Sequence, residues 1–206
     1  MFGTEDFTTY TEVDPGSDLV VTSDIITITA MPCNVDSYIY KDFGADYWTS
    51  FSISFQVKWD GDTGEQPYFY GPSFADSVGS LKGSTGKKIV TRFSIYNTSL
   101  IVSLHVMDGI YDYSYDYKMT TGPVDLYCVM THAQGSNLAY LYIYTDAAMT
   151  QLLDTLAINH AYVNHSFRYL YAMSSYNSGS AYDGTGYVKD LHDNDIDESS
   201  WGGSWG

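Results

Sequence analysis

The sequence predicts an all-β fold in which two antiparallel sheets pack face to face as a sandwich, and three observations support this. Apolar and polar residues alternate with a period of two through most of the chain, as in strands with one buried face. The acidic residues are 21 Asp and only 4 Glu, and Asp favours turns whereas Glu favours helix interiors. About a dozen short strand patterns follow one another without the strand–helix alternation of parallel sheets.

The clearest strand of the first half covers residues 51–59. Phe51, Ile53, Phe55, Val57 and Trp59 share one face, and polar residues occupy the positions between them. The other expected strands before residue 71 are short β-branched or aromatic segments, at residues 19–22, 25–30, 37–41 and 67–70. Residues 71–86 predict an irregular stretch with one helical turn at 74–78.

The second half predicts a series of hairpins. Asp108-Gly109 between two alternating segments is a strong hairpin signal, because both turn residues need positive φ angles. Residues 151–156 fit either a strand or one turn of helix. The expected strands of this half cover residues 89–96, 100–107, 110–119, 124–133, 138–145, 167–174 and 186–191.

We expect one domain, residues 1–191, followed by a tail, residues 192–206. The tail is first acidic and then rich in Gly and Ser, which is typical of a mobile terminus. Trp201 and Trp205 carry a large apolar area for such a tail, so they are candidates for contact with the same domain or with a neighbouring copy.

Net charge and composition exclude several classes of partner. Nine basic and 25 acidic residues give a formal charge of −16, which repels nucleic-acid phosphates and disfavours anionic lipid. No apolar run approaches the length of a membrane span. The first residues lack the basic and apolar regions of a signal peptide, so we expect none, and export by another route stays open.

The two cysteines fit no metal or redox spacing. Cys128 lies within an alternating apolar pattern, so it is interpreted first as a buried free thiol. A disulfide between Cys33 and Cys128 is the alternative.

Several segments together resemble the concanavalin A-like jelly rolls of the laminin G type. The resemblance rests on residues 167–172, on a long loop at 174–185 and on the Gly-led segment 186–191, with residues 51–59 as a central strand and 95–107 as the middle hairpin. The chain also resembles uncharacterised phage and environmental proteins. The resemblance implies a jelly-roll sandwich, and it implies sugar binding, adhesion or glycoside hydrolysis, since these are the activities of the superfamily.

The sequence contains no recognisable catalytic constellation. A retaining glycosidase needs two carboxylates about 5–5.5 Å apart, but Glu occurs only at positions 5, 12, 65 and 198, and no expected strand carries a pair. Asp112 and Asp116 fall on one face of the segment 110–119 and are too widely spaced. The five histidines form no metal-ligand motif. We therefore expect no enzymatic activity, although a triad built from distant residues stays open.

Aromatic residues and an acidic loop are the candidate binding groups. Tyr and Trp suit glycans because they offer both a flat apolar face and a polar group, and Trp59, Tyr68 and Tyr70 lie next to a turn-rich loop. Within that loop Asp60, Asp62 and Glu65 are candidate calcium ligands, because Ca²⁺ prefers clustered carboxylate oxygens. The alternative is that the tyrosines are packing residues and that the loop is an ordinary turn.

These features predict a non-catalytic, lectin-like domain that binds a glycan or a cell-surface polysaccharide, on a virion surface or a cell exterior. The alternative function is a structural or assembly protein, such as a decoration, fibre or coat subunit, whose terminal segments contact neighbouring copies through Trp201 and Trp205. A homo-oligomer or other virion proteins would then be the partners. A glycoside hydrolase or lyase is the third alternative.

Overall fold

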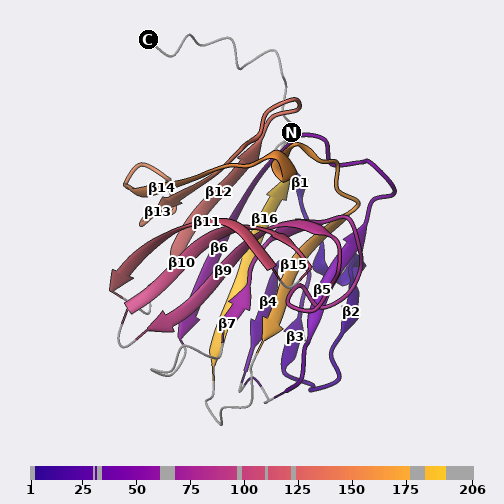
Figure 1. Ribbon diagram of the computed structural model, residues 1–206. Coiled ribbons are helices and arrows are strands. Elements are labelled where there is room, and N and C mark those ends of the chain that lie inside the picture. The colour runs from indigo at the N-terminus through magenta and orange to yellow at the C-terminus, as the bar shows by residue number, and fades with distance from the viewer. Residues whose placement is uncertain are drawn as a thin grey trace.

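Two antiparallel sheets of eight strands each lie face to face in the computed structural model of the chain (Figure 1). The structure describes residues 3–29, 31, 34–60, 68–96, 99–109, 111–121, 124–176 and 184–193. Within these ranges the helical elements are two short 3-10 turns, η1 (Phe7–Thr9) and η2 (Ala161–Asn164), and neither is long or apolar enough to cross a membrane. The all-β, two-sheet fold class predicted from the sequence is confirmed.

Neighbouring strands in both sheets run antiparallel. Sheet A has the order β14 (Leu152–Asn159), β13 (Leu138–Tyr144), β12 (Leu126–His132), β6 (Phe51–Asp60), β16 (Thr185–Asp193), β4 (Ile25–Ile28) and β3 (Leu19–Val21), with β1 (Gly3–Thr4) also beside β16. Sheet B has the order β11 (Tyr111–Thr121), β10 (Ser99–Asp108), β9 (Lys87–Tyr96), β7 (Tyr68–Tyr70), β15 (Tyr169–Tyr176), β5 (Tyr38–Asp42) and β2 (Thr11–Val13), with β8 (Ser73–Ala75) pairing with β15 and β9.

The core lies between the sheets and is strongly aromatic. The Trp59 ring from sheet A meets Phe69 of sheet B edge to face at 5.0 Å, and Phe69 stacks on Phe93 at 5.1 Å. Cys128 is fully buried in the same core as a free thiol, and this burial raises the pKa of the thiol. Cys128 is therefore not in a disulfide with Cys33, which lies outside the described residues.

The strand predictions differ from the structure mainly in the short elements. The helical turn expected at residues 74–78 is wrong, because Phe74 pairs with Ile89 in β8 and points into the core. Residues 151–156 belong to a strand, β14, rather than to a helix. The two short strands β1 and β2 were not expected, since two or three residues leave no periodic pattern to detect.

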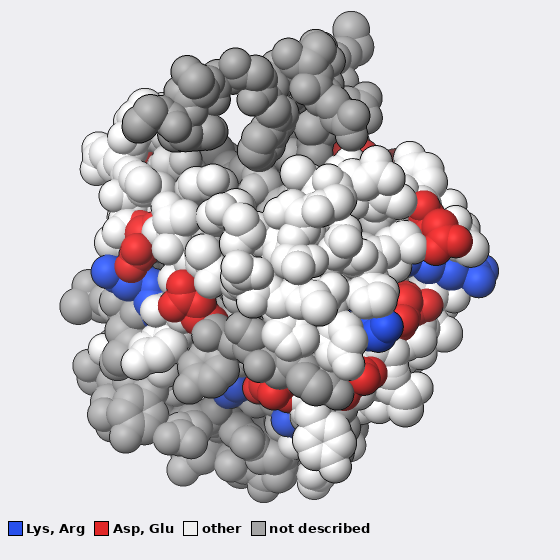
Figure 2. Space-filling view, turned by 45° about the horizontal axis from the view of Figure 1, so that its top comes forward, with Lys and Arg blue, Asp and Glu red and all other residues white. Residues whose placement is uncertain are grey.

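Charged side chains surround a broad uncharged area on the face shown in Figure 2, and the basic residues visible there lie next to acidic ones. Several ion pairs join basic to acidic side chains in the protein. Among the described residues, carboxylates pair with Lys41 (Glu5, 2.7 Å), Lys118 (Asp154, 3.1 Å), Arg168 (Asp42, 2.7 Å) and Lys189 (Asp190, 3.7 Å).

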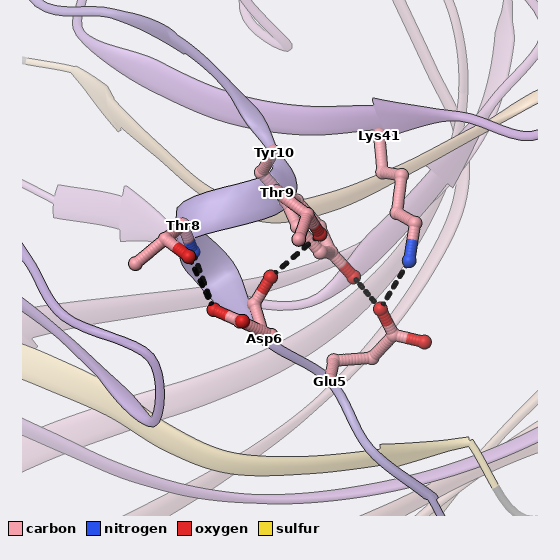
Figure 3. A network of polar contacts seen from close by, with 6 residues as sticks. All are labelled: Glu5, Asp6, Thr8, Thr9, Tyr10 and Lys41. Carbon is pink, nitrogen blue, oxygen red and sulfur yellow. Dashed lines mark hydrogen bonds and ion pairs between the residues drawn. The ribbon is translucent and has the colours of Figure 1, made fainter.

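The N-terminal segment connects the two sheets, since β1 pairs with β16 of sheet A and β2 pairs with β5 of sheet B. Between these strands Asp6 caps η1, and its carboxylate accepts hydrogen bonds from the Thr8 backbone N–H and hydroxyl (Figure 3). Glu5 accepts from Lys41 Nζ at 2.7 Å and from the Tyr10 hydroxyl at 3.2 Å. Residues 3–13 are therefore engaged with their own domain.

A pair of aspartates, Asp14 and Asp18, lies in the segment that joins β2 to β3. Asp18 is 3% exposed, and the Ser37 hydroxyl lies 2.5 Å from Asp18 Oδ1 and 2.9 Å from Asp14 Oδ1. Burial raises the pKa of Asp18 to about 6, and the neighbouring Asp14 carboxylate adds to this. Asp18 Oδ2 has no hydrogen-bond partner among the described residues.

We expect Asp18→Asn to stabilise the domain at pH 7. Between pH 4 and 6 the unfolded chain releases the Asp18 proton while the folded protein retains it, so wild-type stability falls as pH rises through this window. The neutral amide removes that loss, which amounts to about 2 kcal/mol. Urea unfolding at pH 4 and pH 7 measures the effect: the variant should be more stable only at pH 7. Asp36→Asn serves as the control, and an equal gain there would contradict the assignment.

Candidate functional site

The outer face of sheet B carries a second cluster of buried residues, separate from the core between the sheets. It is rich in tyrosine, and it comprises Tyr68, Tyr70, Ala75, Leu81, Val90, Met107, Tyr169 and Tyr171, with Tyr38, Tyr40 and Tyr176 packed against it. Such a face is unusual for a solvent-facing sheet, because alternate positions on an exposed strand are ordinarily polar. Much of the tyrosine surplus seen in the sequence is therefore gathered on one side of the sandwich.

Residues 76–86 cover part of this outer face. The Tyr171 hydroxyl accepts a hydrogen bond from the Gly79 N–H and lies 2.9 Å from the Gly79 carbonyl oxygen. Lys88, which points outward from β9, is 1% exposed, and its amine donates to the Leu81 and Ser84 carbonyl oxygens at 2.5 and 3.0 Å. These contacts hold the segment against the sheet.

A depression of about 280 Å³ lies on the same face of sheet B, over strands β9, β10 and β11. Its volume is just below the about 300–1,000 Å³ typical of ligand pockets. Arg92 and Ser103 occupy directly opposed positions on β9 and β10, as do Ser94 and Ile101. The described residues that line the depression are Arg92, Ser94, Ile101, Ser103, His105, Asp112 and Tyr117.

Asp112 is the one carboxylate among the described residues that line the depression. Its Oδ2 lies 3.4 Å from His105 Nδ1. Partial burial alone would raise the pKa of Asp112, but the interaction with His105 and the charges of Arg92 and Lys82 outweigh it and hold the pKa below its usual value. Asp112 is therefore a carboxylate at neutral pH, and it can accept hydrogen bonds from a ligand.

A β-bulge gives part of β11 an orientation that differs from the one expected from the sequence. Asp112 and Asp116 were predicted to share a strand face, but the register shifts between Val106 and Met107 of the neighbouring strand. Asp112 consequently lies with His105 on the outer face, whereas Asp116 accepts a hydrogen bond from the Ala157 N–H of sheet A at 3.0 Å. An extra residue in one strand reverses the alternation beyond it, so the period of two cannot be carried through residue 113.

The structure separates the three aromatic residues predicted to bind a ligand. Trp59 is fully buried between the sheets and faces away from the depression. Tyr68 and Tyr70 lie on the outer face, where the Tyr68 ring supports the Arg92 guanidinium at 3.8 Å, but both rings are almost completely buried. Tyr68 therefore adjoins the depression, while Trp59 does not.

The other predicted site residues fall largely outside the described part of the chain. Asp60 is exposed at the end of β6, whereas Asp62 and Glu65 belong to residues 61–67, which the structure does not describe. Within the described ranges no group of three His, Cys, Asp or Glu residues could hold a metal. Trp201 and Trp205 also lie outside, so the assembly function and the domain boundary at residue 191 stay predictions.

The depression has a signal in the sequence, which is an alternation of polar and apolar residues in two neighbouring strands. Arg92 and Ser94 alternate with Phe93 and Ile95, and Ser103 and His105 alternate with Leu104 and Val106. Pairing the two segments as a hairpin around residues 97–98 sets their polar positions side by side on the outer face. His105, interpreted as a packing residue, is buried and also lines the depression.

No protein-family model and no curated protein matches the sequence, but the structure is similar to several solved structures. A legume lectin-like domain from Entamoeba histolytica has 13% identity and a TM-score of 0.67, with 95% of this chain and 97% of that one covered. The basic winged bean lectin in complex with Tn-antigen has 8% identity and a TM-score of 0.57, with 94% and 96% covered. A protein of unknown function from Shewanella oneidensis MR-1 has 9% identity and a TM-score of 0.56, with 93% and 76% covered.

At these identities the likeness establishes the fold, which is a jelly-roll sandwich of the legume lectin-like kind. The fold implied by the resemblance of the sequence is thereby confirmed. The relation to phage and environmental proteins stays a prediction.

Proposed function

We propose that this protein is a non-catalytic glycan-binding domain and that the depression over β9, β10 and β11 is its binding site. The observation that carries the proposal is the composition of this depression, in which an exposed tyrosine, Tyr117, stands beside hydroxyl, imidazole, carboxylate and guanidinium groups. A sugar presents a C–H face to an aromatic ring and hydroxyl groups to polar side chains. The legume lectin-like fold supports the proposal as an analogy.

The non-catalytic part of the proposal rests on the carboxylates. Hydrolysis of a glycosidic bond ordinarily uses two carboxyl groups that face each other across the bond. Asp112 is the single carboxylate among the described residues of the depression, and the bulge turns Asp116 to the opposite side of the sheet. A site of this composition supports binding through hydrogen bonds rather than bond cleavage.

Calcium binding by Asp60, Asp62 and Glu65 is part of the proposal. Tyr68, the first residue of β7 after this loop, pairs with Ser94, which lines the depression. We also propose that the domain acts on a virion surface or a cell exterior, where glycans are displayed.

We expect Tyr117→Ala to weaken glycan binding about tenfold, which corresponds to the loss of one aromatic contact worth about 1.5 kcal/mol. Tyr111→Ala is the matched control, because Tyr111 lies on the same strand, is 70% exposed and does not line the depression. A glycan array identifies the ligand, and titration calorimetry with and without calcium measures its affinity. Equal losses in both variants would contradict the location of the site, and an array without any bound glycan would contradict the function.

A further inference from the structure

In the described part of this strongly acidic chain, Arg92 has no ion pair. The chain carries 25 acidic residues for nine basic ones, and Arg168 forms a two-pronged contact with Asp42. Among the described residues no carboxylate oxygen lies within ion-pair distance of Arg92. Its charge lies at the proposed binding site, where it helps to lower the pKa of the Asp112 carboxyl group without a direct ion pair.

Aromatic packing fixes the Arg92 guanidinium in place. Its central carbon lies 3.8 Å from the centre of the Tyr68 ring, a close cation–π contact. Tyr68 is itself held by Tyr70, at 5.5 Å edge to face, and by Tyr176, at 4.9 Å. A guanidinium immobilised in this way loses less conformational entropy when it binds a ligand than a freely rotating side chain would.

The hydrogen-bonding capacity of Arg92 is not exhausted by the protein. Its Nε is buried and has no hydrogen-bond partner among the described residues. A buried donor left without a partner costs about 1–3 kcal/mol, more when the group is charged. Arg92 lines the depression, and the planar fork of an arginine matches carboxylate and sulfate oxygens in two parallel hydrogen bonds.

The surroundings of Arg92 add to this preference. Ser103 is paired with Arg92 across the two strands, and Ser94 lies two residues after Arg92 on the same face, so both hydroxyl-bearing residues line the depression together with Arg92. A second cation, Lys82, lies over the Tyr176 ring at 5.4 Å and close enough to lower the pKa of Asp112. Asp112 is the opposing charge, and it faces His105.

We infer that the ligand of this depression is an acidic saccharide whose carboxylate or sulfate group binds Arg92, with Ser94 and Ser103 contacting the same group or its ring. This inference rests on the proposed glycan-binding function and names its substrate class. A neutral sugar would offer the Arg92 guanidinium no charge-assisted hydrogen bond, and it would have to compete with water for this group.

The test compares acidic glycans with their neutral counterparts on full-length protein. An array pairs sialylated, uronic-acid-containing and sulfated glycans with the same glycans lacking the acidic group, and titration calorimetry follows for each bound pair. We expect the acidic member to bind about tenfold or more tightly and to weaken as salt rises from about 50 to 500 mM. Comparing carboxylated with sulfated members then identifies the anionic group.

Four substitutions test whether Arg92 causes this preference. Arg92→Gln should weaken binding of the acidic glycan about 10- to 100-fold, and Arg92→Lys, which keeps the charge but not the fork, should weaken it less. Lys58→Gln, on the outer face of sheet A, removes the same charge and should leave affinity unchanged. Asp112→Asn removes the opposing charge from an exposed position and should strengthen acidic-glycan binding a few-fold.

The outcomes separate this inference from the proposed function. Equal affinity for acidic and neutral members overturns the acidic ligand and leaves glycan binding intact. The same follows if Asp112→Asn weakens binding of the acidic member, since the carboxylate would then be making the recognising contact. An array with no bound glycan overturns both. Unfolding midpoints are measured for every variant. If the Arg92 variants do not fold, the effect of Asp112→Asn on binding of the acidic glycan decides whether the inference holds.

Discussion

Replacing Gly186 by alanine is expected to destabilise the domain by about 3 kcal/mol, a large part of the stability of a domain of this size. Gly186 lies in β16, where it pairs with Trp59 of β6 on one side and Ile28 of β4 on the other. An added Cβ would clash with the Lys58 carbonyl oxygen and would lie 2.8 Å from the Trp59 ring. Both obstacles belong to a central strand, so neither can move without disturbing the core.

The reason for this glycine is space rather than backbone conformation, because Gly186 has no positive φ. Gly3→Ala is the matched control: Gly3 also pairs with β16, but an added Cβ there meets nothing within 4 Å. Urea unfolding should show a loss of about 3 kcal/mol for Gly186→Ala and less than about 0.5 kcal/mol for Gly3→Ala. Similar values for the two variants would show that the β6–β16 contact yields without strain.

The long alternating strands could be predicted from the sequence because burial determines their pattern. In β6 the five apolar positions between Phe51 and Trp59 all enter the core, and the pattern alone identifies the buried face. The Asp108-Gly109 turn was also readable, since Gly109 has a φ of +67°. The local sequence pattern was sufficient to predict a strand wherever one face is buried and the other is exposed to solvent.

The aromatic residues were harder to interpret because sheet B is buried on both faces around β7 and β15. Tyr68 and Tyr70 alternate with Phe69, which suggests a wet and a dry face, yet all three are buried. Residues 76–86 cover part of the tyrosines, and contacts with residues far away in the sequence hold that segment in place. Composition indicated a tyrosine surplus, but only tertiary structure could show that seven of the 21 tyrosines gather on the outer face of sheet B.

The candidate site was missed for a related reason. Each of its residues is unremarkable in its own segment, and the depression arises where three strands come together. Asp112 in particular depends on a bulge that no local pattern announces. Charge counting could have helped, because Arg92 is one of only nine basic residues and lies mid-strand, where an unpaired charge needs a reason.

Replacement of Lys88 is the second substitution for which we expect a large loss of stability. Replacing it by methionine, which has a similar length, is expected to destabilise the domain by about 3 kcal/mol. The amine of Lys88 donates hydrogen bonds to the Leu81 carbonyl, the Ser84 carbonyl and the Ser84 hydroxyl, at 2.5, 3.0 and 2.7 Å. Burial lowers the pKa of Lys88 to about 8, so the amine still carries its proton at pH 7. Methionine fills the space and leaves those oxygens without a donor.

The same substitution should release residues 76–86 from sheet B. Limited trypsin digestion reports this release through cleavage at Lys82, which should become faster in Lys88→Met. Lys58 is a half-exposed lysine on sheet A, and Lys58→Met is the control. It should change neither the rate of cleavage nor the stability appreciably. Lys88→Arg keeps the charge in a larger group and should restore only part of the stability. Unfolding of Lys88→Met at the wild-type urea concentration would contradict this prediction. The hydrogen bonds of the buried amine would then only offset the cost of removing it from water, and the contacts of Tyr171 with Gly79 would hold the segment instead.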